Sequence, residues 1–184
     1  MTVTWDETTI PGVVRRTLPV FPDDRGEFRE LWRASWTDGI ASRFIQANLS
    51  RSKAGVLRGM HAHQRQDDLW LILEGRAFVA LVDLRRGPAE RPRTYGFEAT
   101  AGQAVLIPTG IAHGFLAIEP LALGYLVTNE YDGTDEHGFA WDDSLAAIAW
   151  PRTDPILSAR DQVNPRLATV LEAWSAAPTP VATE

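Results

Sequence analysis

Residues 55–75 read GVLRGMHAHQRQDDLWLILEG, and this stretch decides the fold. Its second half, residues 69–73, is apolar at five consecutive positions and lies between Asp68 and Gly75. A short unbroken apolar run bounded by polar and turn residues is typical of a strand whose two faces are both buried. The segment therefore predicts a strand inside a sandwich or a closed barrel.

Similar short runs recur along the chain and are separated by glycine-bearing breaks. They cover residues 44–49, 56–61, 69–73, 78–84, 104–107 and 121–128. Helix is expected only at residues 35–42 and 166–174, and the second of these follows Pro165, which suits a helix start. Many short strands between frequent turns predict an all-β barrel with a few short helices. We expect one domain over residues 1–174 and a disordered tail over the small, polar, proline-bearing residues 175–184.

Composition excludes several classes of function. The 184 residues carry 18 basic and 24 acidic side chains, and there is no basic stripe that would neutralise a run of phosphates, so nucleic acid is not expected as a partner. Cysteine is absent, which excludes disulfides and thiolate zinc sites and fits a reducing cytoplasm. No apolar stretch is long enough for a membrane helix, and the first ten residues lack the features of a secretion signal. We expect a cytoplasmic protein that does not bind membranes.

Three histidines occupy a pattern that points to one interior site. His61 and His63 are two residues apart, so on a strand they point to the same face. His113 ends residues 102–113, which read GQAVLIPTGIAH. With Asp68 in the place of a glutamate, the two stretches resemble the paired cupin motifs, which implies a jelly-roll β-barrel, also called a double-stranded β-helix. The fourth histidine, His137, has no such support and is assigned to a turn.

A closer resemblance covers residues 10–167. Residues 24–30 (DRGEFRE), 46–50 (QANLS), 55–61 (GVLRGMH), 82–85 (VDLR), 112–115 (AHGF) and 157–161 (LSARD) are similar to successive signatures of the dTDP-4-dehydrorhamnose 3,5-epimerases. Residues 125–131, 141–143 and 150–151 continue the series. So many separate motifs in one order exclude chance as the explanation.

The resemblance implies a reaction and its catalytic residues. His61 falls where the family has its general base, Asp161 on the carboxylate that orients this base, and Tyr125 on the acid. The combination is chemically sound, because a proton beside a ketone is weakly acidic and its removal needs a positioned base. A carboxylate on the far imidazole nitrogen sets the tautomer and stabilises the imidazolium. The implied substrate is a dTDP-linked 4-keto-6-deoxyhexose, and no cofactor is implied.

The resemblance also implies binding roles and an assembly. The amino-terminal strand would be exchanged in a homodimer, so that some of these residues serve the neighbouring subunit's site. Arg58 is expected to be functional because it lies between apolar strand residues, and a buried charge is rare without a partner. The implied substrate-binding residues are Arg25, Phe28, Glu30, Gln46, Asn48, Arg58, Asp68, His113 and Tyr131.

The sequence departs from the family at one catalytic position. Counting back from Gly75, Asp68 stands where the family has a lysine whose charge stabilises the enolate oxygen. The departure leaves three hypotheses. In the first, the chain is an epimerase of altered scope that acts at C3, C5 or both. In the second, it is a metal-binding cupin that acts as a keto-sugar isomerase, with the ligands His61, His63, Asp68 and His113. In the third, it is a non-catalytic protein that binds sugar nucleotides.

Overall fold

The computed structural model describes residues 4–41 and 43–176 of the chain. It contains thirteen strands, two 3-10 turns and one α-helix in these residues. The strands are β1 (Asp6–Glu7), β2 (Val14–Thr17), β3 (Val20–Asp23), β4 (Gly26–Arg29), β5 (Gln46–Ser52), β6 (Leu57–Ala62), β7 (Asp68–Glu74), β8 (Arg76–Asp83), β9 (Thr94–Thr100), β10 (Gln103–Ile107), β11 (Ile111–Ala117), β12 (Leu121–Val127) and β13 (His137–Gly138). The 3-10 turns are η1 (Ala34–Trp36) and η2 (Gly133–Asp135), and the helix is α1 (Leu167–Ala176).

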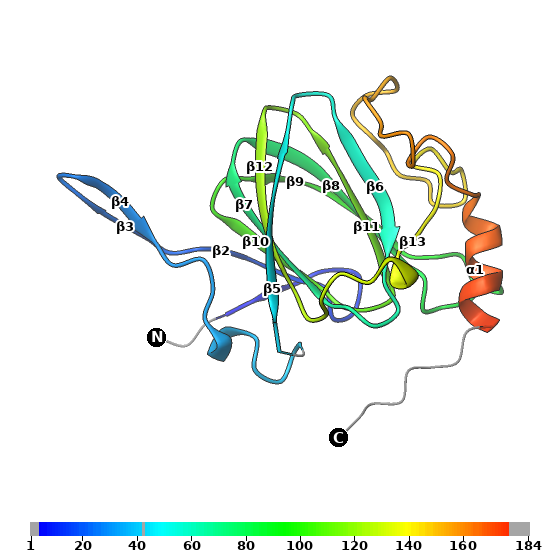
Figure 1. Cartoon of the computed structure of the whole chain (residues 1–184), viewed down its shortest axis with the longest axis horizontal. Helices are drawn as coiled ribbons and strands as arrows, with labels where there is room; N and C mark the ends of the chain where they lie inside the picture. Colours follow the sequence, from blue (N-terminus) through cyan, green and yellow to red (C-terminus); the bar gives the residue numbers. More distant parts are fainter. Residues whose placement is uncertain (1–3, 42, 177–184) are drawn as a thin grey trace.

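Two antiparallel sheets face each other across the molecule (Figure 1). One has the strand order β1-β2-β10-β7-β12-β5, and the other has the order β13-β6-β11-β8-β9. The prediction of an all-β fold is confirmed. Hydrogen bonds between the described strands leave the two sheets separate, so the fold is a two-sheet jelly roll and not a continuously bonded ring.

The six predicted strands correspond to β5, β6, β7, β8, β10 and β12, with ends shifted by up to three residues. Strand β7 is buried at its first five positions, as its unbroken apolar run predicted. Strand β11 was missed, although all seven of its residues are buried. Its sequence IAHGFLA contains a histidine and a glycine, and these interrupt the apolar pattern that marks a buried strand.

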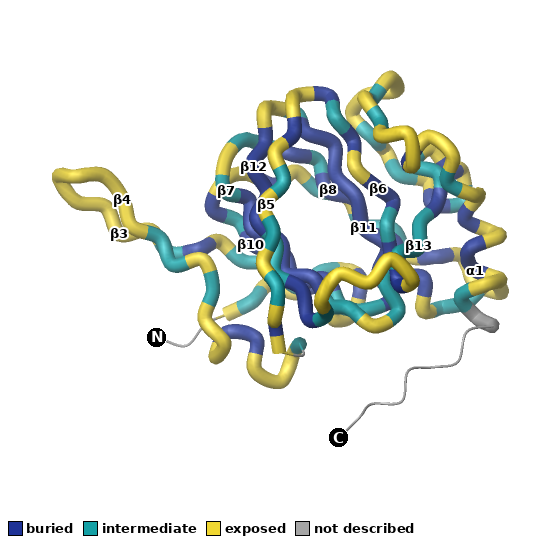
Figure 2. Tube along the Cα trace, in the orientation of Figure 1, coloured by how far each residue is buried: buried dark blue, intermediate teal, exposed yellow. Residues whose placement is uncertain are grey.

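The main core lies between the two sheets, and Figure 2 shows the strands that enclose it as largely buried. Alternate residues of β8, namely Val79 and Leu81, meet Val105 and Ile107 of β10 there. Each such side chain contributes roughly 1.5–3 kcal/mol when it is fully buried. Three residues of this core, Trp70, Phe115 and Leu123, also line the cavity that holds the polar residues of the interior.

A second core lies between the five-stranded sheet and the carboxyl-terminal part of the chain. Helix α1 places Leu167, Val170 and Leu171 in one cluster with Ala80 and Val82 of β8. The predicted helix over residues 166–174 is confirmed, and it continues to Ala176. The first two residues of the predicted tail therefore belong to α1, and residues 177–184 lie outside the described part of the chain. No helix within residues 4–41 and 43–176 is long and apolar enough to cross a membrane.

The helix predicted over residues 35–42 is wrong. Only the 3-10 turn η1 forms there, and turns follow it up to residue 40. Trp36 is buried in a third cluster with Leu18 and Phe44, and its backbone oxygen accepts a hydrogen bond from Trp5 Nε1 at 2.9 Å, so tertiary contacts hold the segment. Gly39 has a φ of 78°, which is incompatible with a continuing helix. Residue 42 itself lies outside the described residues.

The hairpin β3–β4 projects away from the two sheets (Figure 1). Its two aromatic rings, Phe21 and Phe28, pack on each other with centroids 6.1 Å apart and remain 49% and 64% exposed. Exposed apolar side chains gathered on a projecting hairpin are typical of a surface that another chain covers.

Candidate active site

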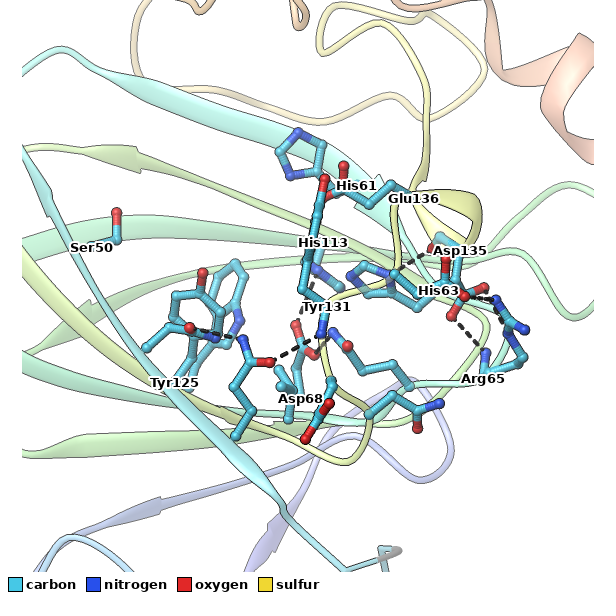
Figure 3. A pocket seen from close by; sticks show the side chains of 18 of the residues that line it. Ser50, His61, His63, Arg65, Asp68, His113, Tyr125, Tyr131, Asp135 and Glu136 are labelled. Carbon is cyan, nitrogen blue, oxygen red and sulfur yellow. Dashed lines mark hydrogen bonds and ion pairs between the residues drawn. The ribbon is translucent and has the colours of Figure 1, made fainter. Parts of the chain in front are cut away.

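A cavity of roughly 440 Å³ opens between the two sheets. Alternate residues of the strands line it, because a strand points every second side chain to the same face. Residues 46, 48 and 50 of β5 and residues 123, 125 and 127 of β12 follow this period, as do Asp68 and Trp70 of β7. Figure 3 shows the polar side chains of this lining converging on one space.

His61 and Asp161 form a hydrogen-bonded pair at this cavity. His61 Nε2 lies 2.7 Å from Asp161 Oδ1, although the two residues are 100 positions apart in the chain. The side chain of Asp161 is 3% exposed, whereas that of His61 is 28% exposed and lines the cavity. Because an ionised carboxylate only accepts, Nε2 carries the proton, and the lone pair of His61 is on Nδ1.

Local contacts hold Asp161 in its charged form. Burial acts to raise the pKa of Asp161, but hydrogen bonds from His61, the Ser158 hydroxyl and the Gly59 backbone outweigh it, and the pKa lies below its usual value. The Asp161 backbone N–H in turn donates to Ser158 Oγ at 3.1 Å. The carboxylate is therefore ionised near neutral pH and can stabilise a proton on the imidazole.

Two glycines let the strands that hold the histidines approach closely. His61 in β6 pairs directly with His113 in β11, and a register shift follows between His113 and Phe115. A Cβ on Gly59 would lie 2.6 Å from the Cα of Gly114, which no side chain tolerates. The irregularity re-aims the side chains around it, as bulges next to active sites commonly do.

Tyr125 faces the same cavity from the other sheet. It belongs to β12 of the six-stranded sheet, whereas His61 belongs to β6 of the five-stranded sheet. Burial, together with the nearby negative charge of Asp68, raises the pKa of Tyr125 above its usual 10. The hydroxyl therefore keeps its proton and can serve as an acid. A base on one wall and an acid on the opposite wall can reach the two faces of a ring bound between them (Figure 3).

Asp68, His113 and His63 gather deeper in the cavity. His113 Nε2 lies 3.3 Å from Asp68 Oδ2, and both side chains are buried. Burial raises the pKa of Asp68 to about 6 against the pull of His63 and of hydrogen bonds from Gln66 and Trp70. Burial, followed by the neighbouring His63, lowers the pKa of His113 well below its usual 6.5. His113 is therefore neutral near pH 7, and its close contact with Asp68 is not an ion pair.

The sequence model of the dTDP-4-dehydrorhamnose 3,5-epimerases matches residues 7–169. The chain belongs to the dTDP-4-dehydrorhamnose 3,5-epimerase family. It is 37% identical over 165 residues to the Escherichia coli (strain K12) dTDP-4-dehydrorhamnose 3,5-epimerase, an alignment that covers 84% of this chain and 89% of the relative. It is 39% identical over 166 residues to a dTDP-4-dehydrorhamnose 3-epimerase from Streptomyces niveus, with 83% and 78% covered.

A solved structure of the family agrees with this assignment. The Legionella pneumophila dTDP-6-deoxy-D-glucose-3,5-epimerase, crystallised with dTDP-4-keto-L-rhamnose, superposes with a TM-score of 0.85. It is 30% identical, and the match covers 97% of this chain and 99% of the other. The present chain is therefore an enzyme of the epimerase class, and its fold is that of the family.

Four of the predicted binding residues of this epimerase line the cavity beside the residues already described: Gln46, Asn48, Arg58 and Tyr131. Gln46 Nε2 donates to Asn48 Oδ1 at 2.9 Å, and the backbone N–H of Tyr131 donates to Gln46 Oε1 at 3.0 Å. Tyr131 is 72% exposed and stands at the rim. The burial argument for Arg58 is wrong, because the residue is exposed and its guanidinium bonds to Ser52 Oγ at 3.1 Å.

Three predicted binding residues lie outside the cavity of their own chain. Arg25, at the tip of the β3–β4 hairpin, has a 90% exposed side chain that forms an ion pair with Asp23 of the same hairpin. Phe28 belongs to the same hairpin, and Glu30 just after it forms an ion pair with Arg33. None of the three lines the cavity between the sheets. Their expected place at a neighbouring subunit's site stays a prediction.

Several cavity residues were missed in the sequence. Ser50 and Trp70 lie on strands whose other cavity residues were found, so the two-residue period would have identified them. Asp135 and Glu136 lie in and after η2, which has no such period. The assignment of His137 to a turn is wrong, because it belongs to β13 and pairs with Ala62 of β6.

Of the four residues that the metal hypothesis names as ligands, the structure brings three together and leaves His61 apart. His63, Asp68 and His113 offer ligand atoms within 4.8 Å of one another, whereas His61 is not part of the group. His63 lies just beyond the end of β6, and its ring centroid is 5.5 Å from that of His113. Nε2 of His61 instead bonds to Asp161. The His61–Asp161 pair and the group of His63, Asp68 and His113 therefore lie in one cavity but contain different histidines.

Proposed function

We propose that this epimerase inverts C3, C5 or both in a dTDP-linked 4-keto-6-deoxyhexose through His61, Asp161 and Tyr125. The observation that carries the proposal is the 2.7 Å contact between His61 Nε2 and Asp161 Oδ1. It leaves Nδ1 as the only basic nitrogen of that ring. A histidine paired in this way and exposed in a cavity has the geometry of a general base.

The proposed reaction proceeds in two proton transfers. His61 Nδ1 removes the proton from the carbon beside the C4 ketone, and the electron pair moves onto the ketone oxygen to form an enolate. The imidazolium is stabilised by the Asp161 carboxylate. Tyr125 then gives its hydroxyl proton to the same carbon from the opposite face, which inverts the centre. Its raised pKa keeps this proton available until the enolate forms.

Cavity residues around this trio support binding of a sugar nucleotide. Gln46 and Asn48 offer amide groups toward the sugar, and Arg58 at the exposed end offers donors for phosphate oxygens. Relatives of this chain bear the names of both a 3,5-epimerase and a 3-epimerase, so the number of inverted centres is left open within the proposal.

The proposed assembly is a homodimer that exchanges its amino-terminal strand. The support is the projecting β3–β4 hairpin, whose Phe21 and Phe28 are exposed, and the position of Arg25 away from the cavity of its own chain. In such a dimer Arg25, Phe28 and Glu30 would meet the nucleotide bound to the partner subunit. We also propose a cytoplasmic location, for which the absence of cysteine is the support.

Incubation with dTDP-4-keto-6-deoxyglucose in heavy water, followed by NMR, tests the reaction. The expected result is deuterium at C3, C5 or both, with a matching inverted product. The His61→Ala variant should take up no deuterium, whereas the His137→Gln variant should behave as the wild type. Binding of the sugar nucleotide without deuterium uptake at either carbon rejects the proposal in favour of a non-catalytic binding protein.

A further inference from the structure

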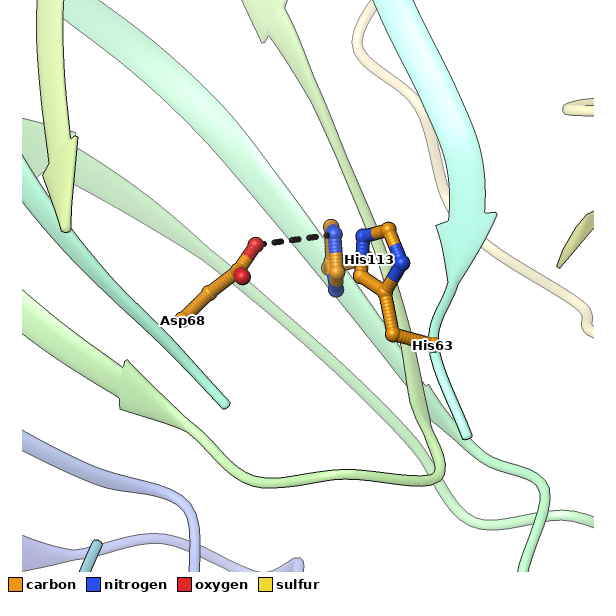
Figure 4. A group of neighbouring side chains, drawn as sticks. All are labelled: His63, Asp68 and His113. Carbon is orange, nitrogen blue, oxygen red and sulfur yellow. Dashed lines mark ion pairs between the residues drawn. The ribbon is translucent and has the colours of Figure 1, made fainter. Parts of the chain in front are cut away.

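Three side chains from separate elements converge in the cavity without a role in the proton transfers. They are His63 after β6, Asp68 at the start of β7 and His113 in β11. One nitrogen or oxygen atom from each lies within 4.8 Å of those of the other two. Figure 4 shows the Asp68 carboxylate aimed at the His113 ring, with the His63 ring beside it. Asp68 and His113 are 3% and 5% exposed.

The hydrogen bonds of the two rings determine which nitrogen is free. His63 Nδ1 lies 2.8 Å from the backbone oxygen of Asp135, and His113 Nδ1 lies 3.1 Å from the backbone oxygen of Ile111. A carbonyl oxygen only accepts, so both Nδ1 atoms carry the hydrogen, and both Nε2 atoms present lone pairs. Histidines that bind metals show this arrangement, in which one ring nitrogen donates to a carbonyl and the other is the ligand.

The carboxylate is arranged in a corresponding way. Asp68 Oδ1 accepts a hydrogen bond from Gln66 Nε2 at 2.7 Å. Asp68 Oδ2 faces His113 Nε2 at 3.3 Å, and with the tautomer given above both of these atoms are acceptors. Two buried acceptors in contact need a cation between them, either a proton or a metal ion. A third lone pair, from His63, favours the metal ion, because one proton bridges only two acceptors.

We propose that His63, Asp68 and His113 bind one divalent first-row transition metal ion. Two imidazoles and one carboxylate suit such ions, and with three protein ligands the remaining positions can face the cavity. Asp135 and Ile111 orient the two rings through their carbonyls. The fourth residue of the earlier hypothesis, His61, is not a ligand, because it remains with Asp161.

The ion explains how Asp68 can replace a lysine. An unpaired carboxylate would oppose the negative charge that forms on the enolate oxygen, whereas a bound divalent ion reverses the local charge and supports it. This catalytic role rests on the proposed epimerisation. The binding site itself stands on the geometry of the three ligands and is tested without substrate.

Metal binding is tested with Co²⁺, whose visible absorption reports its ligands. The purified full-length protein is stripped with a chelator and titrated with Co²⁺, by absorption and by calorimetry. We expect one equivalent to bind, and we expect each of His63→Ala, Asp68→Asn and His113→Ala to weaken binding by more than ~100-fold. His137→Gln, which removes the histidine outside both sites, is the matched control and should bind as the wild type. Asp68→Asn is nearly isosteric and keeps the test valid if an alanine variant does not fold.

The outcomes separate the metal site from the epimerisation. If Co²⁺ does not bind the wild type at millimolar concentration, or if binding survives all three substitutions, the metal site is refuted and a shared proton accounts for the Asp68–His113 contact. If Co²⁺ binds as expected, the site stands whether or not the sugar takes up deuterium. If the protein both binds the metal ion and exchanges deuterium into the sugar, chelation should slow deuterium uptake by at least ~100-fold, and added Zn²⁺ or Co²⁺ should restore it. Unchanged uptake after chelation refutes the catalytic role of the ion.

Discussion

Replacing Asp161 by asparagine gives the most direct test of the proposed base. The substitution keeps the size of the side chain and removes the charge that faces His61 Nε2 at 2.7 Å. The amide group can also donate to Nε2. In that case the imidazole takes the other tautomer, and its Nδ1, the nitrogen proposed to remove the substrate proton, carries a hydrogen. The loss of charge and the change of tautomer therefore both weaken His61 as a base.

The size of the effect follows from the geometry. The Asp161 side chain is buried, and for two unit charges about 4 Å apart at an effective dielectric constant of about 20 the attraction is about 4 kcal/mol. Each tenfold change in rate takes about 1.4 kcal/mol, so loss of this stabilisation slows imidazolium formation by about 10³-fold. The shift in tautomer adds to this value.

The assay is the initial rate of deuterium uptake at C3 and C5 of dTDP-4-keto-6-deoxyglucose, with binding of the sugar nucleotide measured separately. The matched control is Asp154→Asn, which removes a carboxylate of the same region that is 77% exposed and pairs with Arg152. This control should keep the wild-type rate. A folded Asp161→Asn enzyme that exchanges within about tenfold of the wild type would refute the role of the pair.

Four further outcomes are expected. Tyr125→Phe should keep deuterium uptake but lower inverted product by ~10²-fold or more, seen by NMR of the sugar. Because burial and Asp68 raise the pKa of Tyr125, product formation by the wild type should not decline as pH rises from about 8 to about 10, and a fall with a midpoint below the usual tyrosine value would contradict this. Phe139→Ala, at a fully buried position against α1, should cost about 3–5 kcal/mol in urea unfolding, and a loss below about 1 kcal/mol would contradict the packing. Phe28→Asp should shift the protein toward monomer in light scattering, whereas an unchanged mass would exclude the hairpin from the interface.

Much of the fold could be predicted from the sequence, because the patterns that mark buried strands and turns involve only neighbouring residues. An apolar run such as residues 69–73 predicts a doubly buried strand, and β7 is one. The apolar pattern did not predict β11, because His113 and Gly114 interrupt it. His113 lines the cavity, and Gly114 lies in close contact with Gly59. The prediction failed again at residues 35–42, where tertiary contacts, among them the burial of Trp36 and a hydrogen bond from Trp5 to its backbone oxygen, replace the helix by a 3-10 turn.

The candidate site was readable in part. The resemblance named His61 and Asp161 as partners across 100 residues, which no local pattern could do, and the structure brings them into contact. Their catalytic roles remain predictions. Burial of Arg58 was inferred from its apolar neighbours, but at a strand end the side chain turned out to be exposed.

By itself the sequence determined the family, the all-β class and most of the strands, because periodicity and motif order are properties of neighbouring residues. Only the tertiary structure decided that His63, Asp68 and His113 form a second group, apart from the pair of His61 and Asp161. The physical reason is that a ring nitrogen bonds to whichever carbonyl or carboxylate the fold brings within about 3 Å. For His63 and His61 those partners, at Asp135 and Asp161, come from distant segments whose positions depend on the packing of the whole molecule.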